Sequence, residues 1–141
     1  MKVLLKIILA FTALLIVTAP LSLAEQAAEE DAVKSSMKWL ALVDEGKYGE
    51  SWTETAQLFR SALSREQWQK SLESARKPLG KTVSRKLKSK TRTKSLPGAP
   101  DGDYVVIQYD TSFENKKSAI ETVTPMLDKD GKWRVSGYYI R

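Results

Sequence analysis

The chain has 141 residues, is 42% hydrophobic and 28% charged, and carries a formal net charge of +6 at pH 7. It contains no cysteine and no histidine. These absences exclude disulfides, thiolate and imidazole metal ligands, and catalytic triads that depend on histidine or cysteine. The sequence also has no glycine-rich phosphate-binding motif, so we expect neither a cofactor nor a metal. Carboxylates, tyrosines, lysines and hydroxyls remain available for chemistry.

Residues 1–24 have the pattern of an export signal. Lys2 and Lys6 precede an apolar run over residues 7–19, Pro20 ends the run, and residues 22–24 (Ser-Leu-Ala) match a small–x–small cleavage site. The run is shorter than the about 20 residues that a spanning helix needs. We therefore predict a periplasmic or otherwise secreted protein, whose single domain over residues 25–141 is not transmembrane after cleavage and binds no nucleic acid. An uncleaved signal acting as a membrane anchor is the alternative.

Three helices are predicted in the first half of the mature chain. Apolar residues at helical spacing predict one helix over Glu25–Glu45 and a second over Tyr48–Leu63. A capping box formed by Ser64 and Gln67 opens the third, which should end before Pro78. The tryptophans at positions 39, 52 and 68 fall within the apolar stripes, so core packing is the favoured role for them.

The second half predicts four strands joined by short turns, because β-branched and aromatic residues are frequent there and glycine and proline separate the runs. The predicted strands are Lys81–Ser95, Asp103–Glu114, Lys116–Met126 and Trp133–Ile140. Pro125 should lie at a strand end or a bulge, because proline lacks the ladder donor. Helices followed by strands favour the α+β class, with three helices packed on one face of a curved four-stranded antiparallel sheet.

Alternation along the second strand assigns its two faces. The predicted core face carries Val105, Ile107, Tyr109, Thr111 and Phe113, and the mixed face carries Tyr104, Val106, Gln108, Asp110 and Ser112.

One enzymatic interpretation survives the residue inventory. Asp110 or Glu121 could act as a general base inside a concave sheet, with Tyr104 or Tyr109 polarising a carbonyl, provided that burial raises the carboxyl pKa. The favoured alternative is that both carboxylates lie on the solvated side of half-buried strands. Asp110 supports that alternative because it shares its face with polar residues.

A run of basic residues marks the first strand. Five of them alternate in sequence, so they are predicted to share one strand face: Lys86, Lys88, Lys90, Arg92 and Lys94. Such a face could bind an anionic envelope component or an acidic partner protein. The favoured interpretation is that the lysines protect an exposed sheet edge, because this strand comes first in the predicted meander.

Several motifs along the mature chain resemble one bacterial family. They are Trp39-Leu40, Val43-Asp44, Gly46-Lys47-Tyr48, Ser51-Trp52, Phe59-Arg60, the run from Arg76 to Gly80, the run from Leu96 to Tyr104, and the run from Asp130 to Tyr138. Over residues 32–140 the chain is similar to the exported proteins grouped as domain of unknown function 4019. The resemblance implies a small α+β fold like the cystatin-like or NTF2-like cones, with no established activity and no catalytic or ligand residues.

Three functional hypotheses follow. The first is a non-catalytic module that binds a small apolar ligand or a partner protein. The second is the carboxylate and tyrosine enzyme, and the third is a polyanion binder that uses the basic strand. A buried carboxylate lining a concave pocket would favour the second hypothesis. A pocket filled by the protein's own aromatic side chains would remove both the enzyme hypothesis and the small-ligand hypothesis.

Overall fold

The computed structural model describes residues 22–141, so most of the predicted export signal, residues 1–21, lies outside the described residues. The elements are α1 (Leu23–Asp44), α2 (Tyr48–Thr53), α3 (Gln57–Ala62), α4 (Arg65–Arg76), a 3₁₀ turn η1 (Lys77–Leu79), β1 (Thr82–Thr93), β2 (Tyr104–Phe113), β3 (Lys116–Leu127) and β4 (Trp133–Ile140). The predicted α+β class is confirmed, with four α-helices in place of the three that were predicted.

The second predicted helix is divided, which corrects the sequence prediction. α2 and α3 are separated at Thr55 and Ala56, where the chain leaves the helical path and pairs with β4. The Ala56 amide donates to the Val135 carbonyl over 2.8 Å, and Thr55 bridges Val135 in parallel. This pairing covers one part of the β4 edge, so it also removes backbone groups that an open sheet edge would expose.

Local signals set the start of α4 and the end of α1 as predicted, whereas α1 begins two residues before the predicted Glu25 because Ser22 and Glu25 form a capping box. Ser64 accepts from the Gln67 amide and the Gln67 side chain accepts from the Ser64 amide, which completes the capping box of α4. α1 ends in a paired C-terminal cap in which the Gly46 amide donates to Val43 and the Lys47 amide donates to Leu42, with Gly46 at a φ of +76°. This cap places Asp44 in the last turn of α1.

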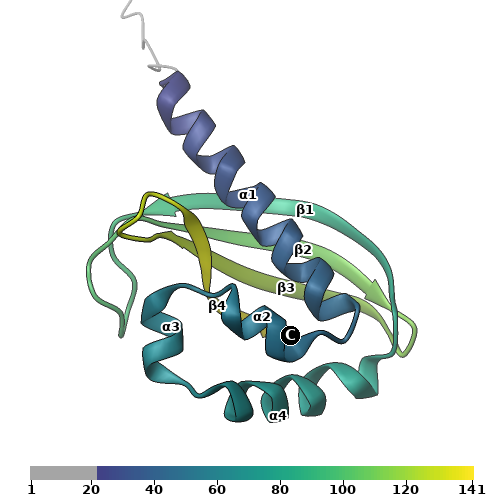
Figure 1. The fold of residues 1–141 in the computed structure, drawn as a ribbon. Helices are drawn as coiled ribbons and strands as arrows, with labels where there is room; N and C mark the ends of the chain where they lie inside the picture. The colour runs from purple at the N-terminus through teal and green to yellow at the C-terminus, as the bar shows by residue number, and fades with distance from the viewer. Residues whose placement is uncertain (1–21) are drawn as a thin grey trace, which may run out of the picture.

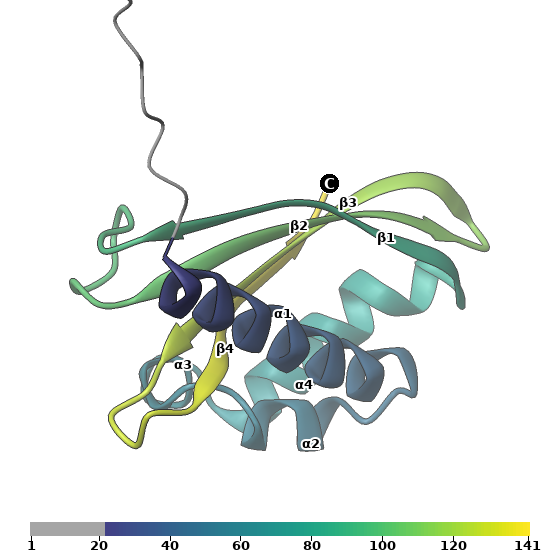
Figure 2. The same cartoon turned by 90° about the horizontal axis from the view of Figure 1, so that it is seen from above.

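The four strands form one antiparallel sheet in the order β1-β2-β3-β4, so β1 and β4 are the edges. A register shift between Thr124 and Pro125 confirms the predicted bulge at the proline. Another of the register shifts lies between Leu87 and Ser89 on β1, where neither glycine nor proline marks it. The sheet is curved, and all the helices lie on its concave side (Figures 1 and 2).

The concave side of the sheet is filled by the protein's own side chains. The core face predicted for β2 is confirmed, since all five of its residues are buried. The core cluster that joins α1, α4 and the sheet contains Ala32, Trp39, Leu40, Val43, Trp68, Leu72, Val105, Ile107, Tyr109, Val123 and Val135. Two of the four tryptophans, Trp39 and Trp68, are buried, and Trp52 and Trp133 pack half-buried against them.

No helix covers the convex face of the sheet in the described chain (Figure 2). Near one end, the loop over residues 96–102 packs on Tyr104, whose hydroxyl donates to the Pro100 carbonyl over 2.6 Å. Tyr104 is therefore buried, although its face was predicted to be mixed. Within residues 22–141, no helix has both the length and the apolarity to cross a membrane.

Candidate functional site

A buried polar network lies beneath the C-terminal end of α1. Its centre is Glu121 on β3, which has no exposed surface. Arg85 on β1 donates to Glu121 Oε1 over 2.7 Å, and Thr111 on β2 donates to the same oxygen over 2.6 Å. Tyr138 on β4 donates to Glu121 Oε2. Both carboxylate oxygens are therefore occupied by groups of the protein itself.

Asp44 extends this network to the surface. Its two oxygens accept from both terminal nitrogens of Arg85 over 2.8 and 3.0 Å, and from Arg76 over 3.0 Å. A carboxylate in the last turn of a helix is unfavourable for the helix dipole, so these two arginines compensate a local cost. Burial alone would raise the pKa of Asp44, but the hydrogen bonds from Arg85 and Arg76 outweigh it and lower that pKa.

Two carboxylates and two guanidinium groups make the network neutral overall. Burial by itself would lower the pKa of Arg85, but its hydrogen bonds to Asp44 and Glu121 outweigh burial and raise that pKa above its ordinary value. The Arg76 guanidinium also stacks over the Phe113 ring, 4.9 Å from the ring centre. An arrangement in which each charge has a fixed partner is typical of a structural cluster that joins elements rather than of a reactive base.

The structure brings together two of the four residues of the enzymatic hypothesis, since Tyr109 and Glu121 are buried register partners on β2 and β3, and it keeps Asp110 and Tyr104 apart from them. Asp110 is exposed on the convex face and forms an ion pair with Lys88, whereas Glu121 lies on the concave face. Glu121 is therefore not on the solvated side of its strand, which corrects the favoured alternative for this residue. Tyr109 is buried with its hydroxyl 2.5 Å from that of Ser36, and burial raises its pKa. Tyr104 lies under the loop at the other end of β2, so no carboxylate and tyrosine of this set shares an open pocket in residues 22–141.

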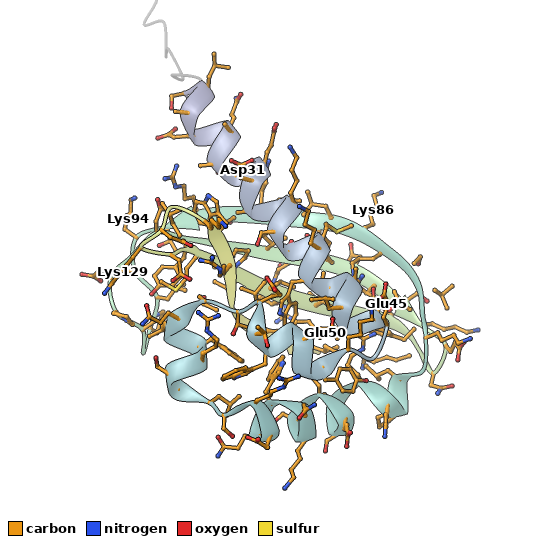
Figure 3. The ribbon with its side chains drawn as sticks, viewed as in Figure 1. Asp31, Glu45, Glu50, Lys86, Lys94 and Lys129 are labelled. Carbon is orange, nitrogen blue, oxygen red and sulfur yellow. The ribbon has the colours of Figure 1, made fainter. Side chains whose placement is uncertain are left out.

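The five basic residues of β1 do not share one face, which also corrects the sequence prediction. The bulge between Leu87 and Ser89 reverses the alternation along the strand. Lys86 pairs in register with Asp110 on the convex face, whereas Lys90 pairs with Ile107 on the concave face. Figure 3 shows Lys86 and Lys94 well apart along β1.

Most of these cations already have partners. Lys88 contacts Asp110 over 3.7 Å and Lys90 contacts Glu29 on α1 over 3.6 Å. Arg92 and Lys94 both contact Asp103, and the hydrogen bond from Arg92 is the main reason that the pKa of Asp103 is lowered. Among residues 22–141, Lys86 is the one member of the five without an ion pair.

A surface depression lies on the opposite flank of α1, and we call it the α1–β4 groove. It has a volume of about 910 Å³ and opens to solvent. Its apolar side chains are those of Trp39, Leu42 and Trp133. The other lining residues come from α1, α2 and the residue after it, the start of α4, the β3–β4 turn and β4: Asp31, Lys34, Ser35, Lys38, Glu50, Thr53, Glu54, Arg65, Gly131, Lys132 and Arg134.

Local structure fixes the walls of this groove. The Ser35 hydroxyl donates to the Trp133 carbonyl over 2.7 Å, which holds the start of β4 against α1. Arg134 binds Asp128 and Asp130 and so braces the turn beside it. The Trp39 indole donates to the Ser51 carbonyl over 2.9 Å and holds α2 against α1.

The remaining charges of the groove are available to a ligand. Four cations on its walls form no ion pair within the described chain, namely Lys34, Lys38, Arg65 and Lys132. The same holds for Asp31 on α1 and Glu50 on α2 (Figure 3) and for Glu54. An apolar floor between charges of both signs is a surface that can bind a polypeptide segment. In residues 22–141 no group of acidic side chains is arranged to hold a metal ion.

Sequence reasoning missed the groove and the role of Asp44. The groove joins residues that are up to 103 positions apart, from Asp31 to Arg134. The position of Asp44 could have been used as a signal. An acidic residue at a helix C-terminus is unfavourable for the helix dipole, so it predicts a cationic partner elsewhere in the fold.

Comparison with known proteins places the chain in a family. No curated protein and no solved structure matches it. The family model described as "Protein of unknown function (DUF4019)" matches residues 35–138, which run from the middle of α1 into β4. The chain belongs to this family of proteins of unknown function.

Proposed function

We propose that this protein is an exported, non-catalytic binding module that holds a segment of a partner protein in the α1–β4 groove. The observation that carries the proposal is the contrast between the filled concave side of the sheet and the open groove beside α1. The α1 helix packs Trp39, Leu40 and Val43 on Ile107 and Val123 of the sheet. These side chains fill the space in which an open, concave sheet could bind a ligand.

The chemistry of the groove favours a polypeptide over a small apolar molecule. Pockets for small molecules are concave and mostly apolar, with few polar groups. The α1–β4 groove instead has charges of both signs on its walls and tryptophan side chains on its floor. A segment with apolar side chains flanked by acidic and basic residues would match this pattern, because each wall charge could then gain a partner.

The buried network supports a non-catalytic role. Glu121 has no free lone pair that faces solvent, because Arg85, Thr111 and Tyr138 occupy its oxygens. A general base must come within hydrogen-bond reach of a substrate proton, and this carboxylate lines neither of the described depressions.

The export signal supports a location outside the cytoplasm, and the resemblance to cystatin-like or NTF2-like cones remains a prediction. The mass of the protein isolated from the producing cell tests export directly. The proposal expects a chain that begins at Glu25, whereas a full-length chain retained in the cytoplasm would refute it.

Site-specific photo-crosslinking in the producing cell tests the groove. A photoreactive residue at Thr53 lies in the groove, and one at the exposed Lys70 on α4 serves as a control position. The proposal expects one discrete protein adduct from position 53 and none from position 70.

A charge-reversed variant makes this test specific. Lys34→Glu combined with Lys38→Glu should remove the adduct from position 53, because it reverses one wall of the groove without touching the core. The matched control, Lys70→Glu with Lys117→Glu, changes the net charge equally and should leave the adduct intact. An adduct that survives reversal of the groove lysines would refute the proposal.

A further inference from the structure

The free edge of β1 is a second surface, besides the α1–β4 groove, that could bind a partner. β1 is an outer strand of the sheet, and among residues 22–141 it pairs with β2 alone. It is 12 residues long, so it exposes a row of unpaired backbone donors and acceptors. The β4 edge, by contrast, is partly covered by Thr55 and Ala56.

The α1 helix crosses the concave side of the sheet and is tied to β1 by two ion pairs (Figure 1). Asp44 of α1 binds Arg85, and Glu29 of α1 binds Lys90, so α1 runs in the direction opposite to β1. Met37 lies on the same flank of α1, because it is two helical turns from both Asp44 and Glu29. The strand and its neighbouring helix can be followed in Figure 1.

Two exposed apolar side chains, one on each element, lie between these two ion pairs in the sequence of α1 and of β1. Leu87 lies between Arg85 and Lys90 on β1 and pairs in register with Tyr109, which places it on the concave side. Leu87 is 42% exposed and Met37 is 47% exposed. These large apolar side chains are left open to solvent beside the unpaired backbone groups of β1.

Charge decides which strand can add here. The chain from residue 76 to residue 100 contains nine basic residues and no acidic one. A second copy of β1 would therefore bring like charges together, which disfavours a homodimer through this edge. Lys86 and Lys88 project on the convex side of the strand, next to the positions that an added strand would occupy.

We propose that the β1 edge binds an extended acidic segment of a partner protein by strand addition. Side chains of an added strand alternate between the two faces of the sheet. Apolar residues of the segment would pack on Leu87 and Met37 on the concave side, and acidic residues would face Lys86 and Lys88 on the convex side. The lysines thus exclude further copies of this chain and select an acidic strand. This proposal uses a different surface from the α1–β4 groove and does not depend on it.

A designed peptide tests the proposal with the purified protein. The probe is a fluorescent peptide of the sequence Val-Glu-Leu-Glu-Val-Glu-Leu, which spans about 23 Å when extended. Binding is measured by fluorescence polarisation at low salt, and the amide exchange of β1 is followed by hydrogen–deuterium exchange. Binding that slows exchange along β1 is expected, and a scrambled peptide of the same composition should bind at least about tenfold more weakly.

Three variants locate the binding. Lys86→Glu with Lys88→Glu should weaken binding by about tenfold or more, since two exposed charge pairs are reversed. Met37→Gln should weaken it about threefold by removing apolar contact. Lys34→Glu with Lys38→Glu, in the groove, should leave peptide affinity unchanged, which separates this proposal from the previous one.

Two results would overturn the proposal. The first is equal binding of the ordered and scrambled peptides without slower exchange in β1, which would mean charge attraction alone. The second is tight binding of vesicles that contain anionic phospholipid, lost in the Lys86→Glu and Lys88→Glu variant, while the peptide does not bind. That outcome would assign the basic strand to a membrane surface.

Discussion

Replacing Arg85 by alanine should strongly lower the free energy of unfolding, and this effect does not depend on a bound ligand. Arg85 supplies the charged hydrogen bond to Glu121 and two further bonds to Asp44. Its loss would leave the Glu121 carboxylate fully buried, with the hydroxyls of Thr111 and Tyr138 as its remaining partners. Asp44 would keep Arg76 and some solvent, so it contributes less to the loss.

The expected magnitude follows from the burial of Glu121. Breaking a buried ion pair from one side costs about 3–5 kcal/mol of unfolding free energy, because an uncompensated charge stays in the interior. Urea unfolding followed by tryptophan fluorescence should therefore show a midpoint lower by on the order of 2 M, with an unfolding slope of about 1–3 kcal/mol per M.

A double variant and a neighbouring control complete the test. Arg85→Met combined with Glu121→Met removes both charges at similar volume and should recover more than half of the loss, because it leaves no unpaired buried charge. Lys86→Ala, next to Arg85 but exposed and without an ion pair in the described residues, should change stability by no more than about 0.5 kcal/mol. A loss below about 1 kcal/mol for Arg85→Ala would refute the assignment of Glu121 to a buried, charged network.

Three further predictions concern other parts of the fold. Ser64→Ala removes the hydroxyl that caps α4 and should cost about 1 kcal/mol in thermal or urea unfolding, whereas Ser64→Thr should cost little. Because the pKa of Asp44 is lowered in the folded state, its charged form stabilises the fold above its ordinary pKa of 3.8, and this contribution disappears as pH falls. Asp44→Asn should therefore lower stability at pH 7 and flatten the stability curve below about pH 4, and an unchanged acid limb would contradict the ion pairing with Arg85. A methyl group at Gly49 would come within 2.6 Å of the flexible end of Arg65, so Gly49→Ala should keep thermal stability and shift that guanidinium, an effect visible as weaker photo-crosslinking in the groove.

The sequence predicted those features that depend on neighbouring residues. Ser64 and Gln67 are three positions apart, and their capping box formed as expected. Pro125 cannot donate in a ladder, and the register shifts at that residue. Strict alternation placed the core face of β2 correctly because the strand has no bulge over Val105–Thr111.

The features that sequence reasoning missed depend on contacts between distant residues. The break between α2 and α3 arises from pairing with Val135, about 80 positions further along the chain, so no helical pattern could reveal it. The bulge after Leu87 reversed the faces of the later lysines, and neither glycine nor proline marks its position. Glu121 can be buried as a carboxylate because Arg85 reaches it from β1 across β2. The order of the strands alone does not predict that contact.

Native mass spectrometry of the protein isolated from the cell envelope fraction tests the central claim most directly. We expect that no small molecule accompanies the folded chain, because the concave side of the sheet is already filled, and that a partner protein is retained unless Lys34 and Lys38 are replaced by glutamate. A stoichiometric small molecule that stays bound to the folded protein, in the original and in the groove variant alike, would contradict it.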